Sequence, residues 1–195
     1  MKRVRAALRG AEQDLRELGR RFALAGGFAV SVRTQPRTTR DVDFVVATLG
    51  DPDAEQLVAD MVARGYRVLT AVEQTAASRL ATVRLQSSAG AVVDLLFAST
   101  GVESEIVEAS ELLEVLRGIH IAVPTVGHLI AMKVLSRNDR ERPQDRVDLA
   151  ELFKCATADD LVEAQGALDL ITRRGFHRKL DLNAAFAQAR AELGP

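Results

Sequence analysis

The sequence predicts an α+β fold, in which a mixed sheet with flanking helices is followed by a helical C-terminal half. Short apolar runs typical of buried strands alternate with helical stretches over residues 1–123. After Pro124 only helical patterns follow. We therefore expect a sheet region at 1–123 and a helical region at 124–195 that packs on it, which 195 residues suffice to build around a sizeable core.

Apolar runs and helix-start signals place the elements of the sheet region. A helix is expected at 4–19, where Gly19 ends it. A second helix is expected at 53–64, because the capping acid and early proline of Asp51-Pro52 suit a helix start. The strands are expected at 22–25, 41–47, 66–69, 80–86, 91–97 and 119–123.

Proline and threonine mark the helix starts of the C-terminal half. Pro124 ends the last strand, and Thr125 is a suitable N-cap for the helix that follows. Pro143 suits the first turn of the next helix. The helices are expected at 126–136, 143–154, 158–171 and 181–193.

The composition is that of an ordinary globular protein, with 47% hydrophobic and 27% charged residues. No apolar run approaches the roughly 20 residues that a membrane span requires. The basic start lacks a small-residue cleavage site, so no signal peptide is expected. Cys155 is the only cysteine, which excludes an internal disulfide. These features predict a cytoplasmic protein with no membrane partner.

Basic residues cluster although the net charge is only −1. A local basic stripe matters more to a phosphate backbone than the overall charge does. Each cluster has the alternative of being a solvated face. The two clusters that flank the motifs described below are Arg33, Arg37 and Arg40, and Arg137, Arg140, Arg142 and Arg146.

Two aspartates open one of the buried strands. Asp41 and Asp43 are separated by Val42 and lead into the apolar run 44–46, and side chains two apart on a strand share a face. Adjacent carboxylates repel each other and need a cation. Mg²⁺ usually takes one or two carboxylates and leaves its other positions to water and phosphates. The alternative is a solvated strand end.

Paired glycines follow the strand at 22–25. Gly26 and Gly27 separate this strand from an apolar-periodic helix that begins with Phe28. Bare backbone N–H groups at such a turn can cradle a phosphate. The pattern of strand, glycine turn and helix is therefore a candidate nucleotide-binding element.

Four motifs in this order resemble the nucleotidyltransferase superfamily related to DNA polymerase β, and most closely the AbiEii and MenT toxins of bacterial toxin–antitoxin pairs. The motifs are LAGGFA at 24–29, TTRDVD at 38–43, VVDLL at 92–96 and LIAMK at 129–133. The resemblance covers roughly 22–153. It implies a polymerase β-like core, an NTP substrate, transfer of NMP to an acceptor hydroxyl at the 3′ end of tRNA, and an antitoxin partner. The alternatives are transfer to a protein or small antibiotic, and a non-catalytic nucleotide- or RNA-binding antitoxin subunit.

The resemblance also implies a metal site. Asp41 and Asp43 would hold two Mg²⁺ ions, with Mn²⁺ as an alternative ion, and Asp94 would complete the site and assist the attacking hydroxyl. An acid in a strand as apolar as 91–97 is costly unless it is paired or metal-bound. The alternative for Asp94 is a structural acid bonded to Arg84.

The phosphate contacts implied by the resemblance come from glycines and cations. Gly26 and Gly27 would admit the phosphates, while Arg40 and Lys133 would neutralise them. Gly27 stands where many members of the superfamily have a serine, and Ser31, one helical turn later, is a candidate substitute. Lys133 lies in a helix that is otherwise almost entirely apolar, so it must snorkel or point into a polar cavity.

A further stretch, RPQDRVDL at 142–149, resembles the last motif of the family, with Gln144 where lysine is common. Asp145 and Asp148 are three apart and share a helix face. Asp145 is the expected functional member, and its alternative is helix capping or pairing with a neighbouring arginine.

Two threonines precede the Asp-x-Asp strand and would lie beside the triphosphate. Phosphorylation of Thr39 would add about two negative charges there and compete for Mg²⁺ and Arg40. We hypothesise that an antitoxin with kinase activity modifies Thr39 and switches the enzyme off. The alternative for Thr38 and Thr39 is turn or strand-start chemistry.

Overall fold

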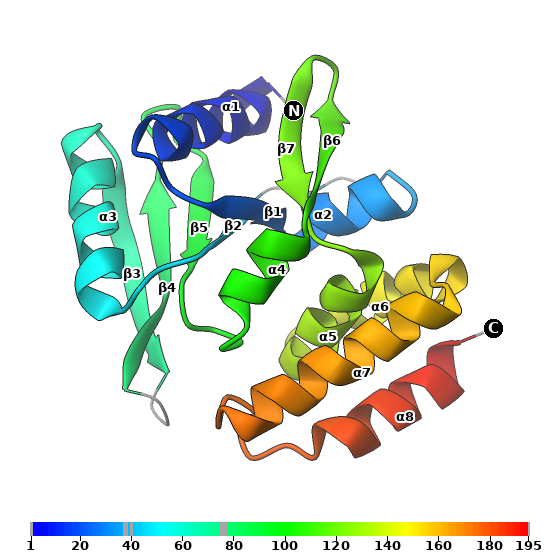
Figure 1. Cartoon of the computed structure of the whole chain (residues 1–195). Helices are drawn as coiled ribbons and strands as arrows, with labels where there is room; N and C mark the ends of the chain where they lie inside the picture. The colour runs from blue at the N-terminus through cyan, green and yellow to red at the C-terminus, as the bar shows by residue number, and fades with distance from the viewer. Residues whose placement is uncertain (1, 37–38, 40, 75–77, 195) are drawn as a thin grey trace.

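The computed structural model describes residues 2–36, 39, 41–74 and 78–194 of the chain (Figure 1). The elements, in chain order, are α1 (Lys2–Glu17), β1 (Phe22–Ala25), α2 (Gly26–Arg33), β2 (Val42–Val46), α3 (Asp51–Ala63), β3 (Arg67–Gln74), β4 (Arg79–Gln86), β5 (Val92–Leu96), α4 (Glu103–Ala109), β6 (Glu111–Leu116), β7 (Ile119–Val123), α5 (Val126–Ser136), α6 (Pro143–Cys155), α7 (Ala158–Arg173) and α8 (Leu182–Leu193).

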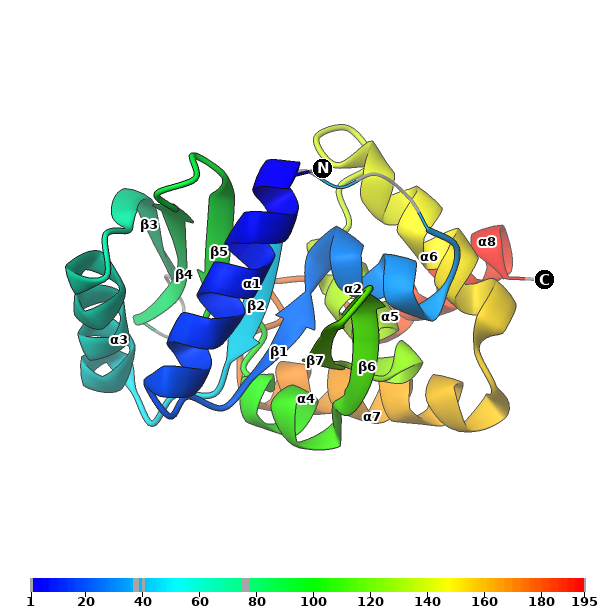
Figure 2. The same ribbon diagram turned by 90° about the horizontal axis from the view of Figure 1, so that it is seen from above.

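The main sheet is mixed, as predicted, with the strand order β1-β2-β5-β4-β3. β2 and β5 pair in parallel at its centre, and the other neighbours pair antiparallel. α1 packs over β2 and β5, and α3 packs over β4, on one face of the sheet (Figure 2). Because side chains alternate along a strand, Val83, Leu85 and Val93 point to this covered face and are buried. The polar residues between them face the other way.

The C-terminal helices lie beside the sheet. α5 contacts α6, α7 and α8, and the hairpin of β6 and β7 stands above them (Figure 1). The hydroxyl of Thr125 caps α5 by accepting a hydrogen bond from the backbone N–H of His128, as its sequence position predicted. One hydrophobic core contains Leu24 and Val93 of the sheet together with Leu129 of α5. The core is therefore continuous across residue 124.

Two stretches differ from the sequence prediction. α4 and β6 occupy residues for which no element was expected, and β3 extends to Gln74 instead of ending at 69. The start of α4 is held by Glu103, whose buried carboxylate accepts hydrogen bonds from the backbone N–H of Thr100 at 2.6 Å and from its hydroxyl at 2.8 Å. Val102 is the N-cap of α4 and makes no side-chain capping hydrogen bond, so the turn before the helix is held by Glu103 instead.

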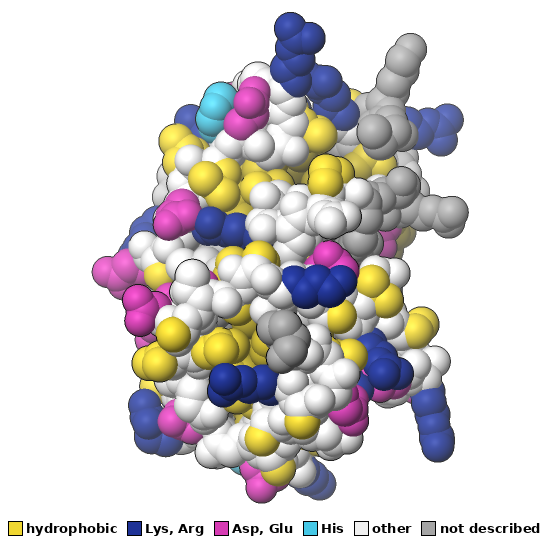
Figure 3. Space-filling model, turned by 90° about the vertical axis from the view of Figure 1, so that its right-hand side faces the viewer, with side chains coloured by type: hydrophobic (Ala, Val, Ile, Leu, Met, Phe, Trp, Pro, Cys, Tyr) yellow, Lys and Arg dark blue, Asp and Glu magenta, His cyan; other side chains and the backbone are white. Residues whose placement is uncertain are grey.

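On the face of the molecule shown in Figure 3, Lys and Arg side chains are interspersed with Asp and Glu side chains. Within the described part of the chain, no helix is both long and apolar enough to cross a membrane.

Candidate functional site

The glycine turn after β1 lies directly against Asp43. Gly26 has a φ of +59°, in the left-handed region that favours glycine. Ala25 is opposite Asp43 in the β1–β2 ladder, which brings the turn beside that carboxylate. A Cβ added to Gly26 would overlap Asp43 Oδ2. Both the backbone conformation and the close approach therefore require glycine at this position.

Three carboxylates meet at the centre of the sheet. Asp43 and Asp94 are direct partners in the parallel β2–β5 ladder, and Asp41 lies just before β2. Burial, followed by repulsion from Asp94 and then from Asp41, raises the pKa of Asp43 from 3.8 to about 6. A carboxylate in this position resists ionisation unless a cation is present.

Arg84 of β4 supplies one such positive charge, but it is directed at Asp94. Its Nε donates to Asp94 Oδ1 at 2.9 Å and its Nη2 donates to Oδ2 at 2.7 Å. The same Nη2 lies 3.8 Å from Asp41 Oδ2. The structural alternative for Asp94, pairing with Arg84, is therefore present, and these hydrogen bonds raise the pKa of the guanidinium.

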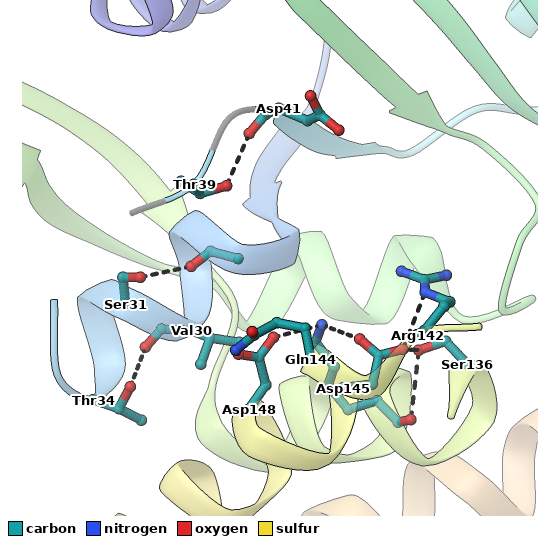
Figure 4. Close-up of polar contacts among 12 residues, drawn as sticks. Val30, Ser31, Thr34, Thr39, Asp41, Ser136, Arg142, Gln144, Asp145 and Asp148 are labelled. Atoms are coloured by element: carbon teal, nitrogen blue, oxygen red, sulfur yellow. Dashed lines mark hydrogen bonds and ion pairs between the residues drawn. The ribbon is translucent and has the colours of Figure 1, made fainter. Parts of the chain in front are cut away.

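The ammonium group of Lys133 lies between two acids of α6, Asp145 and Asp148, which are labelled in Figure 4. Its Nζ is 2.6 Å from Asp145 Oδ1 and 2.8 Å from Asp148 Oδ2, and all three residues are buried. Asp145 Oδ2 also accepts from the Ser136 hydroxyl at 2.9 Å and lies 3.2 Å from Arg142 Nε. Lys133 thus points into a polar cavity, as one of the sequence interpretations expected, but the cavity supplies its own counter-charges.

These groups share one cleft of about 820 Å³ between the open face of the sheet and the start of α6. The predicted site residues that line it are Gly26, Gly27, Thr39, Asp41, Asp43, Asp94, Lys133 and Asp145. Four residues of the sheet that also line the cleft were not predicted as site residues: Thr70, Val72, Thr82 and Leu96. They follow the period-2 alternation of the strands, but no motif marks them.

Residues 11–193 match the model of the family described as nucleotidyl transferase AbiEii toxin, type IV TA system. The chain belongs to this family. The AbiEii family comprises nucleotidyl transferases that act as toxins of toxin–antitoxin systems. The family match confirms the predicted family, the nucleotidyltransferase class and the toxin role. Such a role requires an NTP and an antitoxin as partners.

Three solved structures are similar to this AbiEii family member to different degrees. An antigenic nucleotidyltransferase-like protein from Paracoccidioides brasiliensis is 18% identical with a TM-score of 0.52, over 95% of this chain and 93% of that chain. ANT(2")-Ia in complex with adenylyl-2"-tobramycin is 16% identical with a TM-score of 0.46, over 92% of both chains. Terminal uridylyl transferase 4 from Trypanosoma brucei with bound GTP is 16% identical with a TM-score of 0.39, over 78% of this chain and 48% of that chain. The first of these shows the nucleotidyltransferase fold, and no curated protein matches the sequence significantly.

The AbiEii chain offers two carboxylates to a divalent cation. Among the residues that the structure describes, no group of three His, Cys, Asp or Glu side chains is placed to hold a metal ion. Both oxygens of Asp94 accept from Arg84. This leaves Asp41 and Asp43, and Mg²⁺ usually takes one or two carboxylates. The raised pKa of Asp43 indicates that little positive charge lies beside these two carboxylates. The residues therefore fit the ion.

The hydroxyls near the glycine turn have local partners. Thr39 Oγ1 donates to the backbone oxygen of Asp41 at 3.3 Å, at the edge of the cleft (Figure 4). Ser31 Oγ donates to the backbone oxygen of Gly27 at 2.8 Å within α2, so it is turned toward its own helix. Thr38 and Arg40, also named by the sequence analysis, lie outside the described residues.

Proposed function

We propose that this toxin transfers NMP from an NTP to the 3′-hydroxyl of tRNA, with Mg²⁺ bound by Asp41 and Asp43. One observation carries the proposal. Asp43 and Asp94 stand side by side on two parallel strands, and the Gly26 turn approaches the Asp43 carboxylate so closely that no side chain fits between them. Gly26, Asp43 and Asp94 line the same cleft of about 820 Å³, which supports binding of the triphosphate beside these carboxylates.

In the proposed reaction, the acceptor oxygen forms a bond to the α-phosphorus. The bond between that phosphorus and the oxygen bridging to the β-phosphate breaks, and pyrophosphate leaves with the bonding electron pair. The hydroxyl proton passes to a carboxylate, for which we propose Asp94 in preference to Asp145. Asp94 is the ladder partner of Asp43, whereas Asp145 lies on α6 and is engaged by Lys133, Ser136 and Arg142. Bound Mg²⁺ would supply positive charge to the phosphates.

Lys133 and Arg142 are the cations that we assign to the phosphate side of the cleft. The two acids beside Lys133 hold its ammonium in one place, so its position is fixed before a nucleotide enters. Arg142 has a side chain that is 59% exposed and lines the same cleft. Together they offset Asp145 and Asp148, while Glu141, which also lines the cleft, adds one negative charge to this wall.

An RNA acceptor is supported by the open side of the cleft. Thr70, Val72 and Thr82 form an uncovered patch of the sheet next to the basic Arg84. Arg142, at the start of α6, lines the other side of the cleft and is exposed. A chain of phosphates running past the carboxylates would meet positive charge on both sides of the opening.

Control by an antitoxin kinase is the last part of the proposal. Thr39 is partly exposed and lines the cleft two residues before Asp41. A phosphate on its hydroxyl would occupy the space that the proposal reserves for the NTP and would compete for Mg²⁺. Phosphorylation of Thr39 would therefore block nucleotide binding.

The proposal is tested by incubating the protein with labelled NTPs, Mg²⁺ and total RNA, with an Asp43→Ala variant alongside. Label in tRNA that disappears in the variant is the expected result. Asp159→Ala, at an exposed position outside the cleft, is the matched control and should label RNA normally. Label in protein, in a small molecule or nowhere would refute the tRNA acceptor.

A further inference from the structure

One row of side chains crosses the whole sheet at the level of the carboxylates. Ala25 of β1 is opposite Asp43 of β2, which is opposite Asp94 of β5. Asp94 is opposite Arg84 of β4, and Arg84 is opposite Thr70 of β3. Direct neighbours in a sheet share a face, so the row runs from the glycine turn to the uncovered edge of the sheet.

From this row we infer that Arg84 is a resident counter-cation that competes with the divalent ion for Asp94. When the ion binds, the guanidinium leaves Asp94 and turns to a phosphate of the acceptor strand over Thr70. Arg84 thereby acts as a positioning residue that couples loading of the metal to binding of the acceptor. The inference rests on the proposed function for the identity of the acceptor, but not for the competition itself.

The geometry of the pair supports competition. Arg84 takes one lone pair on each oxygen of Asp94, so an ion that uses the remaining lone pairs lies beside a guanidinium of like charge. Charge-assisted hydrogen bonds of this bidentate kind are among the strongest in proteins. Metal binding by Asp94 therefore has to overcome the Arg84 contact.

The burial of the two partners decides which one moves. The Asp94 side chain is 9% exposed and that of Arg84 is 47% exposed. Asp94 is fixed in the centre of the sheet, whereas the guanidinium borders the open cleft. Its neighbour on the free side is Thr70, on the uncovered β3 strand, where an acceptor phosphate has access.

Arg79 provides a matched comparison on the same strand. It also donates from Nε to an aspartate, Asp51 Oδ1, at 2.7 Å, and its side chain is 35% exposed. It does not line the cleft that holds the carboxylates. Loss of Arg79 removes an equivalent ion pair without freeing a group for the proposed metal site.

The first experiment measures Mn²⁺ binding to the full chain by electron paramagnetic resonance at pH 8, without NTP or RNA. Arg84→Met should bind Mn²⁺ roughly ten- to hundredfold more tightly than the wild type, the factor that corresponds to a hydrogen bond to a charged group. Arg84→Lys, which cannot donate in bidentate fashion, should fall between them. Arg79→Met should match the wild type. If Arg84→Met does not fold, Arg84→Lys alone decides the comparison.

The second experiment measures the binding of fluorescent tRNA by anisotropy in the presence of Mg²⁺. Arg84→Met should bind the RNA more weakly and lower the salt-dependence slope by about one, as expected for one lost phosphate contact. Equal or weaker Mn²⁺ binding by both Arg84 variants, or unchanged RNA binding, would overturn the inference. If the labelling experiment finds no transfer to tRNA while Arg84→Met still gains Mn²⁺ affinity, the acceptor assignment fails and the competition stands.

Discussion

Replacing Asp43 with asparagine should stabilise the metal-free protein at neutral and alkaline pH. The folded protein holds the Asp43 proton more tightly than the unfolded chain does, because its pKa rises from 3.8 to about 6 on folding. Ionising this group in the folded state is therefore costly, so stability falls as the pH rises from about 4 to about 6 and stays lower above that range. The difference of about 2.2 in pKa corresponds to about 3 kcal/mol.

Asparagine has the same shape as aspartate and no charge, so Asp43→Asn should unfold with a free energy about 3 kcal/mol larger than the wild type at pH 8. At pH 5 the gain should be about half as large, because part of the wild type is then protonated. The measurement is urea denaturation with EDTA at both pH values, with Asp159→Asn as a control that should show no gain. Adding Mg²⁺ should stabilise the wild type and leave Asp43→Asn unchanged. Equal or lower stability of Asp43→Asn at pH 8 in EDTA would refute the reasoning.

Three further substitutions test other parts of the site. Lys133→Ala should lower the transfer rate about 10²- to 10³-fold and, because it removes the ammonium that two buried carboxylates share, should also cost about 3–5 kcal/mol in urea denaturation; wild-type stability would contradict the ion-pair network. Gly26→Ala should abolish transfer and destabilise the fold by about 1–3 kcal/mol, because the added Cβ overlaps Asp43. As a control, Gly166→Ala should stabilise α7 by about 0.5–1 kcal/mol, because a Cβ there meets nothing within 4 Å. Thr39→Glu should raise the KM for NTP above that of Thr39→Val, and equal KM values at the two substitutions would exclude charge as the means of control.

Much of the fold could be predicted because local signals in the sequence agree with the tertiary structure. β1, β7 and α5 have the predicted boundaries, each set by a glycine, proline or threonine at the end of an apolar run. The segment that forms α4 and β6 was missed because its apolar residues follow no clear period.

The partners of the charged residues were harder to predict. The Asp-x-Asp motif locates two acids, but the three-dimensional structure decides that Lys133 meets both Asp145 and Asp148. The lysine and these acids come from different helices, α5 and α6, whose packing a motif does not encode. The choice between a metal ligand and an arginine partner for Asp94 likewise depends on the register of β4 against β5. Motifs therefore indicated where the site is, and the packing determines which charges are already paired within it.

The parallel pairing of β2 with β5 determines the stage of synthesis at which the carboxylate pair of the site can form. Asp43 and Asp94 are ladder partners although about 50 residues separate them in the chain. Contacts between such distant segments form late, because a long loop must close before the pair is made. A ribosome must therefore synthesise β5 before the two carboxylates can meet, and truncated products that end before it lack half of this pair. Such a fragment therefore lacks the carboxylate pair on which the proposed transfer depends.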